Sequence, residues 1–162
     1  MPALDETLET RVAIGQWLAP QTTLHWAIPH VTSWMESSVP PELPGIVYAK
    51  LGDAAWQRFY DFSRWPDGWA GPHSHAVAWG TYQNLGKFLS AARFVTGRPP
   101  PSLFVTDDGM LELSWEARDG STINVTLTPE GADFFIEARG EEAHVQSEGL
   151  GELAERCHQA TA

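Results

Sequence analysis

Residues 111–127 read LELSWEARDGSTINVTL. Apolar and polar side chains alternate through the first six positions and again through the last six, with Asp119-Gly120 between the two runs. Alternation with a period of two is typical of a strand that has one packed and one solvated face. An Asp-Gly pair favours the positive φ angles of a tight hairpin turn. The stretch therefore predicts an antiparallel hairpin with Leu111 and Trp115 on its packed face.

The same period continues on both sides of this hairpin. It predicts a short strand at residues 103–105, a fourth strand at 132–138 and a further hairpin into residues 143–146. Turn residues lie at each junction, and tight turns make consecutive strands neighbours in an antiparallel sheet. We therefore expect a four- to five-stranded antiparallel meander over residues 102–147.

Helical periodicity precedes the meander, over residues 51–97. A first helix is predicted from an N-cap at Asp53 to the loop at 65–72, which reads WPDGWAGP. A second, longer helix is predicted from an N-cap at Ser74 to Thr96, and we expect it to cover the packed face of the sheet. These residues thus form two helices joined by a loop rich in tryptophan and glycine.

Two glycines, Gly80 and Gly86, lie inside the longer predicted helix. Each costs about 1 kcal/mol relative to alanine in a helix interior. Their presence predicts a helix that is held by packing and that allows another backbone to come close.

The two ends of the chain complete a single predicted domain, residues 1–162. Residues 1–50 predict an N-terminal helix over about 5–18 and an extended segment, with a proline-rich connector loop at 40–44. Residues 148–160 predict a C-terminal helix, because their apolar residues share one stripe. The fold class that follows is α+β, with helices packed on one face of the meander.

The composition predicts a protein that folds without a disulfide. Of the 162 residues 43% are hydrophobic and eight are tryptophans, which is too apolar and too aromatic for a disordered chain. Cys157 is the only cysteine, which fits a reducing compartment. The acidic first residues do not resemble a secretory signal, and no stretch reaches the roughly 18 apolar residues of a membrane span. We therefore expect a cytoplasmic protein.

The negative charge is concentrated in one half of the chain. The formal net charge is −11, and residues 107–156 hold thirteen acids against three bases, a net of −10. Residues 1–106 hold eight acids and seven bases, a net of −1. Repulsion of phosphates by the acidic half opposes direct binding of nucleic acid, so we expect none.

Three stretches resemble a loose group of small bacterial and phage-borne proteins. They are the loop at 68–72 (GWAGP), the helix end at 86–89 (GKFL) and the strand at 108–115 (DGMLELSW). The group combines a Trp-Asp-Gly loop, a helix and an Asp-Gly hairpin strand that ends in Trp, although Ala70 replaces the loop aspartate here and no tyrosine follows Gly71. The resemblance spans roughly residues 65–138 and implies the architecture, with no activity attached.

No catalytic or metal-binding motif occurs in the chain. His73 and His75 are the nearest approach to a metal pair, but no HExxH and no CxxC accompany them. GxSxG, GxGxxG and GxxxxGK are absent as well, and Cys157 falls on the apolar stripe of the last helix, as a buried hydrophobe would. We expect no enzyme, no cofactor and no metal site, and rank a hydrolase that uses His73 or His75 last.

The loop with two tryptophans allows two interpretations. Trp65 and Trp69, with His73 nearby, form an aromatic platform for a sugar or another small ligand in the first. In the second, the two rings fold back and close one end of the core. We favour the second because most of eight tryptophans in a small domain must be partly buried.

The solvated face of the meander is the candidate binding surface. By alternation, it carries four carboxylates and one exposed ring, which belong to Glu112, Glu116, Asp133, Phe135 and Glu137. Carboxylates steer the approach of a basic partner, and a phenylalanine supplies apolar area to bury. The alternative at even odds is a solvated face that only keeps the protein soluble.

The hypothesis that follows is a non-enzymatic acidic protein that binds a basic protein or protein complex. A nucleic-acid-binding partner fits best, because carboxylates can occupy a site that otherwise holds phosphate. Phage-encoded inhibitors, antitoxins and immunity proteins need such a surface. The alternative hypothesis is a small-ligand or carbohydrate-binding module built on the Trp65–Trp69 loop. Neither membrane binding nor an oligomeric state is predicted.

Overall fold

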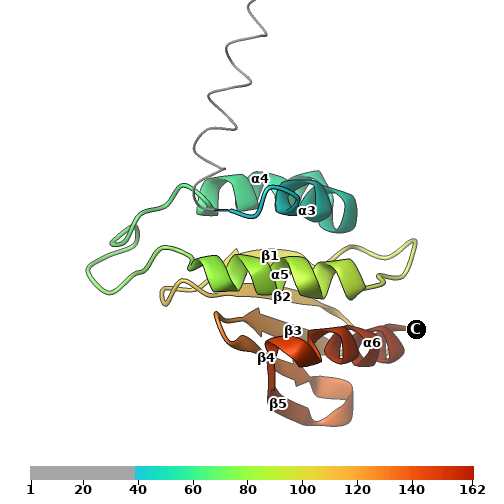
Figure 1. Cartoon of the computed structure of the whole chain (residues 1–162). Helices are drawn as coiled ribbons and strands as arrows, with labels where there is room; N and C mark the ends of the chain where they lie inside the picture. The colour runs from blue at the N-terminus through green and yellow to red at the C-terminus, as the bar shows by residue number, and fades with distance from the viewer. Residues whose placement is uncertain (1–38) are drawn as a thin grey trace, which may run out of the picture. The chain divides into compact units, whose positions relative to one another are not determined.

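The structure is a computed structural model that describes residues 39–162. The N-terminal helix predicted at about 5–18, and most of the predicted extended segment, lie outside these residues. The described elements, shown in Figure 1, are α3 (Leu43–Leu51), α4 (Asp53–Phe62), α5 (Trp79–Ala91), β1 (Ser102–Val105), β2 (Leu111–Glu116), β3 (Thr122–Leu127), β4 (Gly131–Ile136), η1 (Glu137–Arg139), β5 (Glu141–Gln146), η2 (Ser147–Gly149) and α6 (Leu150–Thr161).

The five strands form one antiparallel sheet in the order β1-β2-β3-β4-β5. The predicted α+β class and antiparallel meander are therefore confirmed. β4 ends at Ile136, short of the predicted 138, because η1 turns the chain there and Gly140 adopts φ 56°. β5 then begins at Glu141, two residues earlier than predicted.

The Asp-Gly turns form as the sequence indicates. Gly120 has φ 83° and Gly109 has φ 74°, values that glycine adopts without steric penalty. Asp119 accepts hydrogen bonds from the hydroxyl and the backbone N–H of Ser121, and both bonds lower the pKa of the Asp119 carboxyl. The turn between β2 and β3 is thus closed by its own side chains.

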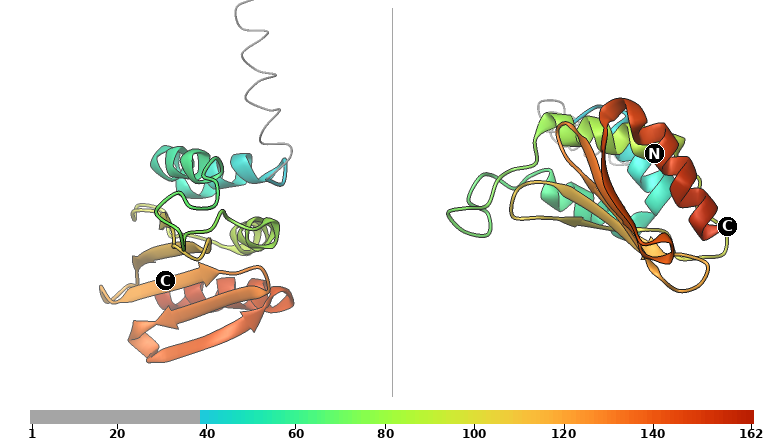
Figure 2. Two further views of the ribbon diagram at one scale, coloured as in Figure 1. Left: turned by 90° about the vertical axis from the view of Figure 1, so that its left-hand side faces the viewer. Right: turned by 90° about the horizontal axis from the view of Figure 1, so that it is seen from below.

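The sheet buries one of its two faces. Along β2, Leu111, Leu113 and Trp115 are buried, whereas the residues between them are half-buried or exposed. Helices α5 and α6 lie beside each other over the buried face (Figure 2). Trp115 joins the layers: its indole N–H donates to the hydroxyl of Thr161 in α6 at 3.4 Å, and its ring meets Phe94 edge-on.

Helix α5 is shorter than predicted, and the N-cap at Ser74 is wrong. The Ser74 hydroxyl accepts from the N–H of Ala70 at 2.8 Å and donates to Gly71 O at 2.9 Å, so it holds the preceding loop together. His75 N donates to Asp107 O, which keeps the chain extended until Trp79. The helix also ends at Ala91 rather than Thr96, since the next residue has an extended ψ of 138°.

The two glycines in α5 behave differently. A Cβ on Gly80 would lie 3.0 Å from the carbonyl oxygen of Pro129, so the predicted close approach of another backbone is confirmed there. A Cβ on Gly86 would meet only the Leu43 side chain, at 3.6 Å. Only Gly80 is therefore required by packing.

The proline-rich connector loop predicted at 40–44 ends earlier than expected, because helix α3, which was not predicted, begins at Leu43. Pro44 lies in the first turn, where the backbone N–H has no helical acceptor, so proline is tolerated. Leu43, Val47 and Leu51 of this helix are buried in the core. The predicted helix at α4 is confirmed, but Asp53 is its first residue and forms no side-chain cap.

The C-terminal helix α6 forms with its predicted stripe inward. Leu150, Leu153, Ala154 and Cys157 are all buried. At the opposite end of the sheet, α4 packs beside β1, and α3 packs against both α4 and α5 (Figure 1). Among residues 39–162, no helix is both long enough and apolar enough to cross a membrane.

Candidate partner-binding face

The face of the sheet opposite α5 and α6 is here called the outer face. It is built from every second residue of each strand. Strand register places its side chains in rows across the sheet. One row runs Phe104, Glu112, Thr126, Asp133 and His144. The next row runs Ser102, Ser114, Asn124, Phe135 and Glu142. Residues that are distant in sequence therefore share one surface.

The predicted carboxylates are arranged in two pairs at the two ends of β3. Glu112 and Asp133 flank Thr126, and two strand spacings put their backbones roughly 10 Å apart. Glu116 lies opposite Thr122, whose N–H donates to the Glu137 carboxylate at 2.7 Å. Three of the four carboxylates are exposed, and Glu112 is half-buried.

Phe135 lies between the two pairs, beside Asn124. Its side chain is 37% exposed, a high value for a ring on a strand whose neighbours Phe134 and Ile136 are buried. Strand register places Glu112, Glu116, Asp133 and Phe135 on one side of the sheet, whereas Glu137 belongs to η1 and not to β4. Their role in binding stays a prediction.

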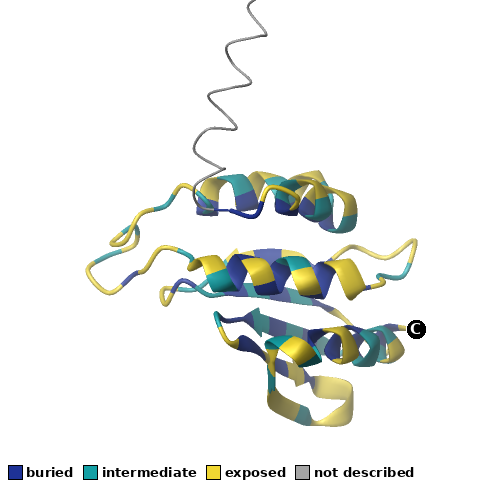
Figure 3. Cartoon of the chain, in the orientation of Figure 1, coloured by how far each residue is buried: buried dark blue, intermediate teal, exposed yellow. Residues whose placement is uncertain are grey.

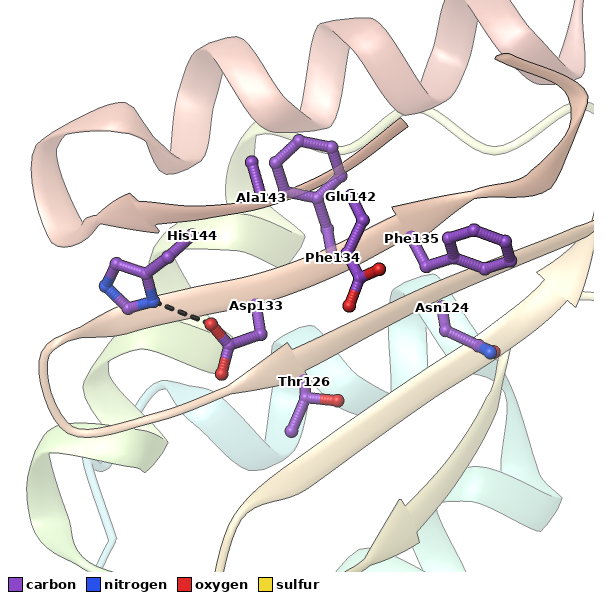
Figure 4. A pocket seen from close by; sticks show the side chains of 8 residues that line it. All are labelled: Asn124, Thr126, Asp133, Phe134, Phe135, Glu142, Ala143 and His144. Carbon is purple, nitrogen blue, oxygen red and sulfur yellow. Dashed lines mark hydrogen bonds and ion pairs between the residues drawn. The ribbon is translucent and has the colours of Figure 1, made fainter. Parts of the chain in front are cut away.

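A shallow hollow of 380 Å³ opens on this face between β3, β4 and β5 (Figure 4). Asp133 and His144 form its edge, with the Asp133 Oδ1 and His144 Nδ1 atoms 2.8 Å apart. The side-chain oxygen of Asn124 is buried and accepts no hydrogen bond from any residue between 39 and 162.

The sequence did not single out His144 and Glu142 as members of this surface. Their alternation within β5 was the available signal, but it indicates a face only once the partner strand and register are known. The pairing of Asp133 with His144 and of Phe135 with Glu142 supplies that register.

The loop with two tryptophans is closed by local contacts. The rings of Trp65 and Trp69 stack with centroids 4.3 Å apart, and Trp65 also packs against Phe62 and the core. The indole N–H of Trp69 donates to His75 O at 3.2 Å. Both rings are half-buried, whereas His73 is exposed.

No group of metal-ligating side chains is gathered in the described part of the chain. The nearest oxygen of Asp67 lies 3.9 Å from His75, but in residues 39–162 no three His, Cys, Asp or Glu side chains come together as metal ligands would. Burial raises the pKa of the Cys157 thiol to about 12, so the thiol stays protonated and unreactive near neutral pH.

Comparison with protein-family models, with curated proteins and with solved structures found no match. The resemblance to small bacterial and phage-borne proteins and the cytoplasmic location therefore stay predictions. The functional argument depends on the outer face itself.

Proposed function

We propose that this protein is a non-enzymatic binder of a basic protein and that the outer face is its binding surface. The observation that carries the proposal is the placement of Phe135 between two carboxylate pairs, Glu112 with Asp133 and Glu116 with Glu137. Long-range attraction guides a basic surface toward the carboxylates, and burial of the ring then adds short-range affinity.

The partner class that fits best is a protein that binds nucleic acid. Strands β2 and β4, with β3 between them, hold carboxylates at fixed spacing, and such an array can meet lysine and arginine side chains that otherwise contact phosphates. The role that follows is inhibition, in which this protein occupies the site where the partner otherwise holds nucleic acid. Phage inhibitors, antitoxins and immunity proteins are the classes that fit this role. The net charge of −10 over residues 107–156 supports it.

Charge reversal tests the proposal. One variant carries lysine at Glu112, Glu116, Asp133 and Glu137. A matched control carries lysine at four other exposed acids, namely Asp53, Asp61, Glu148 and Glu152. Each set raises the formal net charge from −11 to −3, because each change adds two charges. Only the position of the charge differs between the two proteins.

The readout is capture of proteins from a host lysate by the tagged full chain, with circular dichroism to confirm folding. We expect the outer-face variant to lose basic partners that the control still captures, and added salt to weaken capture by the wild type. Equal capture by both variants, or equal loss, would reject the outer face as the binding surface.

The alternative, a ligand-binding module on the Trp65–Trp69 loop, has less support. Two ring surfaces face each other, and the indole N–H of Trp69 already has an acceptor in His75, so less of the platform is available to a sugar. Its test is quenching of tryptophan fluorescence by a panel of saccharides. Quenching that Trp69→Ala abolishes without unfolding would favour this alternative.

A further inference from the structure

The two edges of the sheet differ in what lies beside them. Next to β1, α4 contributes Arg58, whose guanidinium reaches Leu103 O at 3.5 Å and lies over the Phe104 ring. β5 is the opposite edge, and among residues 39–162 it pairs with β4 alone. Figure 3 shows β5 mostly in the colour of exposed residues. One edge is thus covered by a helix and the other is open.

The backbone groups that point outward from β5 follow from one hydrogen bond. Ser147 N donates to Glu130 O, so this pair and every second pair along the ladder are the hydrogen-bonded ones. Ala143 and Val145 therefore bond to β4. The N–H and C=O groups of the alternate residues, which are Glu142, His144 and Gln146, point away from the sheet.

The side chains of β5 divide in the same way. Glu142 and His144 lie on the outer face, next to Phe135 and Asp133. Ala143 lies on the inner face, opposite the buried Phe134, yet it is exposed, and Val145 is half-buried. An added strand would meet Glu142 and His144 on one side and the exposed Ala143 and half-buried Val145 on the other.

We propose that the open edge of β5 accepts an extended basic segment of the partner as a sixth strand. This rests on the proposed function and names its mode of recognition. Main-chain hydrogen bonds to Glu142, His144 and Gln146 supply affinity, and alternate side chains supply specificity. Lysine or arginine at every second position lies beside Glu142 on the outer face, and apolar residues between them cover Ala143 and Val145.

The negative charge of the chain favours a basic segment of a partner at the β5 edge over a second copy of the chain. Each copy carries a net charge of −11, of which residues 107–156 hold −10, so two copies repel each other. A basic strand gains from the same charges.

The direct test uses a capped octapeptide of alternating lysine and valine and the isotope-labelled full chain. With the peptide at ten times its Kd, we expect amide exchange at Glu142, His144 and Gln146 to slow by about tenfold. Amides at Ala143 and Val145 already bond to β4 and should change less. Absence of any slowing at the first three amides would overturn the proposal.

Matched peptides separate backbone pairing from simple attraction. When the peptide adds antiparallel to β5 with its lysines opposite Glu142 and His144, the lysine N–H groups face β5 and the valine N–H groups face away. N-methylation of every lysine should abolish the slowing, whereas N-methylation of every valine should leave it. A glutamate-valine peptide should have no effect. Equal effects of both methylated peptides, or exchange that is already slow in a dimer of the free chain, would also overturn the proposal.

A variant of β5 separates this inference from the proposed function. Gln146→Pro removes an N–H that points away from β4 at a position whose φ of −72° suits proline, whereas the control Gln146→Ala keeps it. We expect Gln146→Pro to lose partner capture at unchanged thermal stability and Gln146→Ala to retain it. If the outer-face lysine variant loses capture while Gln146→Pro retains it, the proposed function stands and strand addition is wrong. Retention by both would reject both.

Discussion

Asn84 shows how a single buried polar side chain connects separate segments. Its amide N–H groups donate to Thr128 O at 2.8 Å and to Pro129 O at 3.2 Å, and its oxygen accepts from the Ser147 hydroxyl at 2.8 Å. Helix α5 is thereby bound both to the turn between β3 and β4 and to the residue that follows β5. The amide nitrogen and the amide oxygen of Asn84 are therefore both hydrogen-bonded.

Replacing Asn84 with alanine should therefore be costly. The change removes the Asn84 donor from Thr128 O and Pro129 O, and a buried unpaired group costs about 1–3 kcal/mol. We expect the free energy of unfolding, measured by urea denaturation, to fall by that amount or more. Ser147→Ala leaves only the Asn84 oxygen unpaired, because Glu130 O keeps the Ser147 backbone N–H as a donor, and should cost less. A loss as small for Asn84→Ala as for Ser147→Ala would contradict this account.

Helix α5 offers an internal comparison between two glycines. Gly86→Ala gains helix propensity of about 0.5–1 kcal/mol, because the new methyl group meets only a flexible Leu43 side chain. Gly80→Ala brings the same gain but forces a methyl group against the Pro129 backbone. We expect chemical denaturation to show higher stability for Gly86→Ala and lower stability for Gly80→Ala. The reverse order would mean that α5 does not approach the turn this closely.

The strands could be predicted from sequence because their evidence is local. Alternation and Asp-Gly turns act within a few residues, and the meander then follows without long-range information. Ser74 and Pro44 show the opposite case. A serine that serves a loop looks identical to an N-cap, and a proline in a first turn resembles a loop proline, so the bounds of α5 and the existence of α3 depended on tertiary contacts.

The candidate site was predictable to the same degree. Alternation within each strand predicts the shared face of Glu112, Glu116, Asp133 and Phe135. The addition of Glu142 and His144 required the register between β4 and β5, which a one-residue slip would reverse. Which edge of the sheet is open could not be predicted, because this depends on where α4 packs. No stretch of sequence carries that information alone.

At the scale of the whole molecule, stability is linked to pH through the buried Cys157. Its thiol has a pKa of about 12 in the folded chain and an ordinary value of 9.0 when exposed. Above about pH 9 the unfolded chain releases this proton while the folded chain keeps it, so stability falls as pH rises. Below that pH the contribution is complete.

Urea denaturation between about pH 8 and pH 11 checks this linkage. We expect the wild type to lose stability more steeply than Cys157→Ala, with a difference in slope that approaches about 1.4 kcal/mol per pH unit. A thiol reagent at pH 8 should modify Cys157 only as fast as the chain unfolds. Parallel slopes for the two proteins, together with rapid modification of the native chain, would show that the thiol is accessible.

The meander also has a consequence for the order in which the molecule is assembled. Every strand pairs with the next one along the chain, so each hairpin closes a short loop at low entropic cost. Topologies dominated by such local pairings fold quickly. The whole outer face comes from one continuous stretch, residues 102–146, which precedes α6. During synthesis, the surface proposed to meet a partner is therefore complete in sequence before α6, the second of the two helices that cover its reverse side, has been made.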